Sequence, residues 1–92
     1  MTDCRDLILP DLGLDDQPIV LSMWLVKEGA RVAQGEPVVE VLGGSVTVDL
    51  PAGADGILIE KLVADGQTLA IGQRLAVIET EWEEALPDRN ED

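Results

Sequence analysis

The chain contains the same sequence pattern twice, and this repeat constrains its fold more than any other feature. A shift of 37 positions places Val20–Leu42 on Ile57–Glu79 without a gap. The identical pairs are Leu21 with Leu58, Leu25 with Leu62, Val26 with Val63, Gly29 with Gly66, Ala33 with Ala70 and Gly35 with Gly72. Two copies are too few for a solenoid, in which stacked repeats cover one another. The repeat therefore predicts a closed domain with internal pseudo-two-fold symmetry.

Each copy has the residues of short strands separated by tight turns. Most of the apolar residues are Val, Leu and Ile, which suit a pleated and half-buried surface. Glycines supply the positive φ that tight turns require. The predicted strands are Ile19–Val26, Arg31–Val32 and Pro37–Leu42 in the first copy, Ile57–Val63, Thr68–Leu69 and Arg74–Glu79 in the second, and Leu7–Pro10 and Val46–Leu50 beside them. One copy alone leaves its apolar face exposed, so the two are expected to pack as a flattened sandwich or barrel.

The link between the two copies is predicted as a β-hairpin. The strand Val38–Leu42 is followed by Gly43 and Gly44, and Val46–Leu50 then alternates between apolar and polar side chains. Two strands joined by such a short glycine segment are typical of a hairpin. By the alternation, Ser45 lies on the solvent side. We therefore expect Gly43-Gly44-Ser45 to form a tight, exposed turn.

The charge of the chain excludes several classes of partner. It has 19 acidic and 6 basic residues, for a formal net charge of −13. Nucleic acids and anionic membrane surfaces both require a basic contact surface. No apolar run approaches the roughly 20 residues of a membrane span, and the N-terminus lacks a signal-peptide core. We therefore expect a cytoplasmic protein that binds neither nucleic acid nor membrane.

The absence of histidine restricts catalysis and metal binding. Serine–histidine and cysteine–histidine pairs are excluded, and with Cys4 as the only cysteine so is a structural zinc site. Cys4 is expected in a frayed, polar N-terminal segment. An enzyme would have to use Ser45 with a carboxylate such as Asp49 or Asp55, in a domain too small for a deep pocket of its own. We expect no catalytic residue and no metal.

The last residues differ in character from the rest. From residue 79 onward acidic side chains dominate, and Trp82 is the only large aromatic residue. Such a composition favours a solvated tail. We predict a domain over residues 1–79 and an acidic, flexible tail over residues 80–92. The alternative is one helical turn over Glu81–Leu86, with Trp82 folded back on the domain or docked on a partner.

Several segments together resemble the lipoyl/biotinyl-attachment, or swinging-arm, domains, and the lipoyl type in particular. Leu9–Gly13 is similar to the start of a lipoyl domain, and Val26–Val38 is similar to the turn segment of its first half. Leu50–Ala52, Gly56 and Val63–Gly66 match the second half in order and spacing. The resemblance covers most of the chain. It implies an all-β flattened barrel of two four-stranded antiparallel sheets.

The resemblance also implies a swinging arm, and the sequence departs from it there. In the family, a hairpin lysine carries lipoate or biotin through an amide and moves acyl or carboxyl groups between active sites. Counting back 11 positions from Gly56 places that lysine at Ser45, with Gly44 in place of the usual aspartate or methionine. The lysines of this chain, Lys27 and Lys61, lie elsewhere. We therefore expect no bound lipoate or biotin.

Three functional hypotheses follow from the resemblance. The first is a binding or assembly module of a 2-oxo acid dehydrogenase or carboxylase-type complex, contacting protein partners through the hairpin and the loop after the first strand. There, Asp15 and Asp16 form either an acidic contact patch or a solvated turn, and they are too few for a calcium site. The second is an unusual covalent group on Ser45. The third is a functional carrier domain whose lysine has been mutated.

Overall fold

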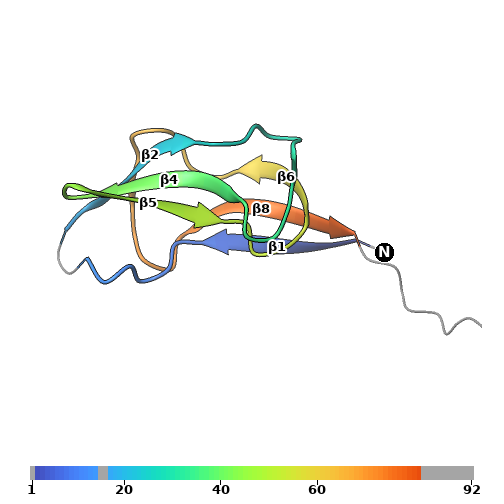
Figure 1. The fold of residues 1–92 in the computed structure, drawn as a ribbon, viewed down its shortest axis with the longest axis horizontal. Helices are drawn as coiled ribbons and strands as arrows, with labels where there is room; N and C mark the ends of the chain where they lie inside the picture. Colours follow the sequence, from blue (N-terminus) through green and yellow to red (C-terminus); the bar gives the residue numbers. More distant parts are fainter. Residues whose placement is uncertain (1, 15–16, 82–92) are drawn as a thin grey trace, which may run out of the picture.

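The fold is a flattened sandwich of two antiparallel four-stranded sheets, as the sequence predicts (Figure 1). The structure, a computed structural model, describes residues 2–14 and 17–81. The strands are β1 (Thr2–Ile8), β2 (Ile19–Trp24), β3 (Arg31–Val32), β4 (Pro37–Gly43), β5 (Val46–Pro51), β6 (Gly56–Lys61), β7 (Thr68–Leu69) and β8 (Arg74–Glu81). The first sheet has the order β1-β8-β6-β3 and the second has the order β5-β4-β2-β7.

The predicted internal symmetry is present in the strands and in their hydrogen bonds. The same shift of 37 positions takes β2 to β6, β3 to β7, and the start of β4 to the start of β8. The bond from Leu25 N to Val38 O recurs as the bond from Leu62 N to Leu75 O, each at 2.9 Å. Each copy also gives its two-residue strand to the other sheet, because β3 pairs with β6 and β7 pairs with β2. The two copies therefore interlock and form one core.

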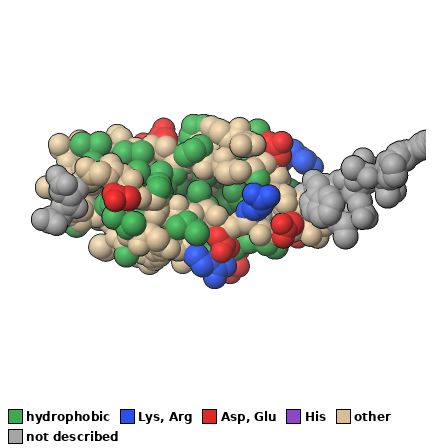
Figure 2. Space-filling view, turned by 90° about the horizontal axis from the view of Figure 1, so that it is seen from below, with side chains coloured by type: hydrophobic (Ala, Val, Ile, Leu, Met, Phe, Trp, Pro, Cys, Tyr) green, Lys and Arg blue, Asp and Glu red, His purple; other side chains and the backbone are tan. Residues whose placement is uncertain are grey.

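The core is aliphatic and lies between the sheets. No polar or charged side chain among the described residues is buried. The largest fully buried side chains are Leu9, Leu21, Leu58, Leu75, Ile78, Val32, Val38, Val39 and Val41. Some large apolar side chains are exposed on the surface. In the view of Figure 2, apolar side chains are interspersed with acidic and basic ones.

The N-terminal segment differs from the prediction. The sequence predicts a strand over Leu7–Pro10 and a frayed segment around Cys4. Both predictions were wrong, because Thr2–Ile8 forms β1 along the edge of the first sheet. Cys4 pairs with Glu79 in that ladder. The five residues before Leu7 in this strand are all exposed. They therefore carry no apolar alternation, and main-chain pairing with β8 decides their structure.

The other strand limits shift by a few residues. β2 and β6 end before the predicted Val26 and Val63, and β8 continues to Glu81. Thr80 pairs with Asp3, and its hydroxyl donates to the Asp3 carbonyl at 3.3 Å. The predicted tail beyond residue 81, including Trp82, lies outside the described residues.

Candidate functional site

The hairpin between β4 and β5 has a two-residue turn, Gly44-Ser45. Gly43 is buried, belongs to β4 and pairs with Val46 at the start of β5. The prediction that Gly43 is part of the exposed turn was therefore wrong, because the ladder extends one residue further. Gly44 has a φ of 62°, which is the left-handed backbone that the first position of a tight hairpin turn requires. Ser45 is exposed at the tip, as predicted.

The loop between β1 and β2 packs against this turn. A Cβ atom on Gly43 would collide with Leu14 Cδ1, and one on Gly44 would lie 2.8 Å from Gln17 Oε1. The amide of Gln17 donates to the Leu14 carbonyl at 3.1 Å, which closes the loop on itself. The structure thus brings together the hairpin and the loop that the sequence singled out. Asp15 and Asp16 lie outside the described residues, so their acidic patch stays a prediction.

The two faces of the hairpin have different surroundings. Thr47 and Asp49 are exposed on the outer face of the second sheet, whereas Val48 and Leu50 turn toward the core. Val46 shares the inner face by alternation, but it is 47% exposed because it lies at the tip, beyond the core. The tip around Ser45 is therefore formed by small and neutral side chains.

Neither lysine lies at the hairpin tip. Lys61 is in β6, and its Nζ lies 5.1 Å from the centre of the Trp24 ring. The Trp24 indole donates to the Val63 carbonyl at 3.2 Å, which fixes the ring under the ammonium group. Lys27 lies in a turn that is closed by a 3.0 Å hydrogen bond from the Ala30 amide to the Lys27 carbonyl. Both side chains belong to other parts of the surface.

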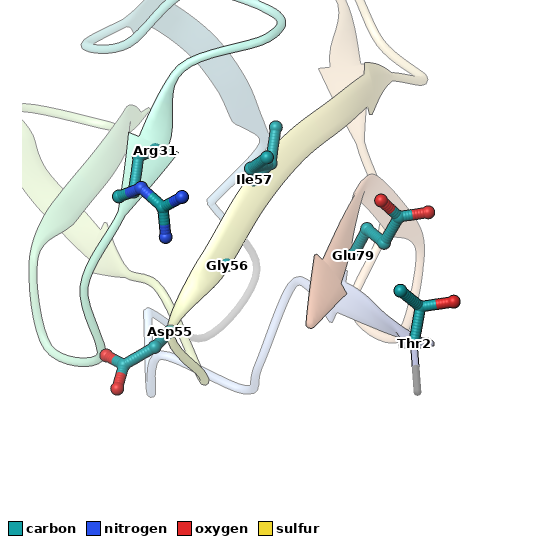
Figure 3. A pocket seen from close by; sticks show the side chains of 6 residues that line it. All are labelled: Thr2, Arg31, Asp55, Gly56, Ile57 and Glu79. Atoms are coloured by element: carbon teal, nitrogen blue, oxygen red, sulfur yellow. The ribbon is translucent and has the colours of Figure 1, made fainter. Parts of the chain in front are cut away.

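A shallow hollow lies at the end of the sheets opposite to the hairpin tip. Its volume is about 190 Å³. Arg31 and Asp55 lie on one side of Gly56 and Ile57, and Glu79 and Thr2 lie on the other (Figure 3). Asp55 accepts a 2.7 Å hydrogen bond from the amide of Gln34. A catalytic pair of Ser45 with Asp55 is therefore not formed, because the two residues are at opposite ends of the fold.

In the part of the chain that the structure describes, no group of three or more His, Cys, Asp or Glu side chains is placed to hold a metal ion. These residues also contain no helix long and apolar enough to cross a membrane.

The flattened double sheet with a hairpin displayed at one end is the architecture of a lipoyl-type domain. A lipoyl domain of the 2-oxoglutarate dehydrogenase complex from Azotobacter vinelandii has a similar structure, with a TM-score of 0.66 and 26% identity, over 83% of this chain and 95% of that one. The Biotin_lipoyl family, described as biotin-requiring enzyme, matches residues 5–78. The chain belongs to this biotin/lipoyl family.

Several curated relatives are acyltransferase components of 2-oxo acid dehydrogenase complexes. The lipoamide acyltransferase component of the branched-chain alpha-keto acid dehydrogenase complex of Bacillus subtilis is 32% identical over 84% of this chain. The dihydrolipoyllysine-residue succinyltransferase component of the Escherichia coli 2-oxoglutarate dehydrogenase complex is 34% identical over 76%. The matches span 18% and 17% of those two proteins. This chain therefore resembles their lipoyl carrier domains and covers only a small part of their length.

Proposed function

We propose that this chain is a lipoyl-like domain that carries no lipoate or biotin and acts as a non-catalytic binding or assembly module. The observation that carries the proposal is the residue at the hairpin tip. Ser45 occupies the position where the family resemblance implies the modified lysine, and its side chain ends in a hydroxyl group. Lipoate and biotin are attached through an amide, which requires an amine.

The positions of the two lysines support this proposal. Lys61 lies in a strand over the face of Trp24, and Lys27 lies in a turn on another part of the surface. A ligase that recognises a lysine at the tip of a hairpin finds neither of them there. Thr47 and Asp49, the outward residues of the hairpin, offer no amine either.

The partners we propose are subunits of a 2-oxo acid dehydrogenase complex or of a carboxylase-type complex. The names of the relatives place them in complexes of the first kind. A single-chain long-chain acyl-CoA carboxylase has a similar fold, with a TM-score of 0.68 at 21% identity. The contact surface that we propose consists of the hairpin tip and the loop packed on it, where Leu14 and Gln17 approach Gly43 and Gly44.

The binding role predicts that purified subunits of a 2-oxo acid dehydrogenase complex from the same cells bind the unmodified domain. Replacing Asp15 and Asp16 with asparagine should weaken this binding several-fold, because it removes two negative charges from the segment between β1 and β2. Isothermal titration calorimetry measures the affinity. The control replaces Asp65 with asparagine. Asp65 corresponds to Glu28 in the repeat and lies in another turn, so this variant should bind as the parent does. Absence of binding to these subunits, or equal binding by all variants, would contradict the proposed contact surface.

A further inference from the structure

The outer face of the second sheet carries two rows of side chains. The first row crosses all four strands through Thr68, Val20, Leu42 and Thr47, which are neighbours in the ladders. The second row crosses three strands through Met23, Glu40 and Asp49. We call these seven residues the second-sheet face. It is continuous with the hairpin, since Thr47 lies two residues after Ser45.

The second row contains an opposed pair of like charges. Glu40 on β4 lies directly opposite Asp49 on β5, and Glu40 is partly buried. Like charges at directly opposed positions of an antiparallel pair are destabilising. No basic side chain of the described residues forms an ion pair with either carboxylate, since the one ion pair found there joins Arg74 to Asp6. The opposed carboxylates thus lower the stability of the isolated domain.

The symmetry-related row of the first sheet shows how the same positions are occupied when the negative charge is compensated. In the first sheet, Asp6 takes the place of Asp49, and the residue opposite to it is the apolar Val77. The Asp6 carboxylate also binds Arg74, with an N–O distance of 3.0 Å. The residue that corresponds to Arg74 by the shift of 37 positions is Pro37. The same backbone position is therefore neutralised in one sheet and left as an opposed pair in the other.

The strands of the two sheets also differ in their content of basic residues. The strands of the second sheet contain no basic residue, and Glu40 and Asp49 are their only charged residues. The strands of the first sheet contain Arg5, Arg31, Lys61 and Arg74 among their acidic residues. Next to the carboxylate pair, Met23 is 47% exposed. The second-sheet face therefore combines uncompensated negative charge with exposed and half-buried apolar side chains.

We infer that the second-sheet face is a docking surface for a protein partner that presents an arginine or lysine side chain among apolar residues. The partner's cation would lie between Glu40 and Asp49, and its apolar residues would cover Met23, Val20 and Leu42. This inference deepens the proposed function by adding a second contact surface beside the hairpin. A second copy of the chain docked through the same face does not fit, because it would bring another pair of carboxylates to the same place. An anionic membrane surface does not fit for the same reason.

The variant Glu40→Lys tests this inference without risk to the fold. It converts the opposed like charges into an opposite-charge pair, so the melting temperature of the free domain should rise by roughly 1–5 °C. The matched control is Glu60→Lys, which changes the net charge equally. Glu60 lies opposite Val77 on the outer face of the first sheet.

The binding probe is a short synthetic peptide that alternates arginine with valine, titrated into isotope-labelled domain and followed by NMR. We expect chemical-shift changes at Val20, Met23 and Leu42. Glu40→Lys should weaken the peptide's affinity at least about tenfold, whereas Glu60→Lys should change it less than about twofold. A peptide with glutamate in place of arginine should cause no shifts.

Three results would overturn the inference: no shifts on the second-sheet face, shifts confined to the hairpin and the loop over residues 13–18, or equal losses of affinity in both variants. The last result would mean that the peptide responds to net charge alone. These failures are distinguishable from failure of the proposed function, because the unmodified state is measured separately by mass. A domain that binds the peptide but carries lipoate would refute the proposed function and leave the docking surface standing.

Discussion

The double variant Gly44→Asp, Ser45→Lys should become a substrate of lipoate ligase, with conversion from none to most of the protein. The turn is already of the kind that displays a side chain, because Gly44 provides the positive φ and Ser45 is exposed at the tip. Aspartate tolerates this backbone better than most residues do. Its Cβ would lie 2.8 Å from Gln17 Oε1, the mobile end of a side chain, so Gln17 can move aside.

The measurement is the intact mass after co-expression with the ligase and lipoate. The single variant Ser45→Lys distinguishes the effect of the amine from that of the neighbouring aspartate. We expect it to be modified less completely than the double variant. The control is Thr47→Lys, which places an amine on the same hairpin, on its exposed outer face. It should keep its unmodified mass. A double variant that folds but stays unmodified would show that the hairpin differs from that of a carrier domain in more than its lysine.

Replacing Gly56 with alanine should destabilise the domain by about 3 kcal/mol, the upper part of the range for overpacking a core. The added Cβ would collide with the Glu79 carbonyl oxygen and lie 2.9 Å from the Glu79 carbonyl carbon and 3.1 Å from Ile78 Cγ2. The backbone atoms belong to β8, the neighbouring strand in the first sheet, and cannot move aside as a side chain can. In a domain of this size, the loss corresponds to a fall in melting temperature of more than about 10 °C.

The matched control is Gly53→Ala, in the connection between β5 and β6 that leads into Gly56. A Cβ at Gly53 meets nothing within 4 Å, and its backbone is not left-handed. Thermal unfolding of this variant should coincide with that of the parent or lie slightly above it, because alanine restricts the unfolded chain. Equal losses in the two variants would mean that the effect comes from the connection as a whole and that the contact with Glu79 is not its cause.

Much of the fold follows from the sequence, because its repeat and its apolar pattern have one consistent solution. The three strands of each copy that carry buried residues were located to within a few positions, since their inward side chains alternate with exposed ones. The strand Thr2–Ile8 was not, because the sequence of an edge strand with exposed side chains contains no such signal. Gly43 was placed in the turn for a related reason. Two consecutive glycines do not reveal where the ladder ends, and the pairing of Gly43 with Val46 decides it.

The candidate site was predicted unevenly. The exposure of Ser45 follows from strand alternation, and the resemblance identified the loop that packs on the hairpin. The opposed pair of Glu40 and Asp49 was missed, because it depends on the register between β4 and β5. Counting outward from a two-residue turn would have found it, since Glu40 and Asp49 are equally far from the turn. The contact of Lys61 with Trp24 joins strands of different sheets, so no local pattern indicates it.

The central claim is that this chain has the shape of a lipoyl domain and lacks the arm. The most direct test is the intact mass of the native sequence, produced with an active lipoate ligase or biotin ligase and the corresponding acid, and also isolated from its own cells. We predict the mass of the bare polypeptide in every sample, with Ser45, Lys27 and Lys61 unmodified in peptide maps. An added lipoyl, biotinyl or phosphopantetheinyl group on any of these residues would contradict the claim.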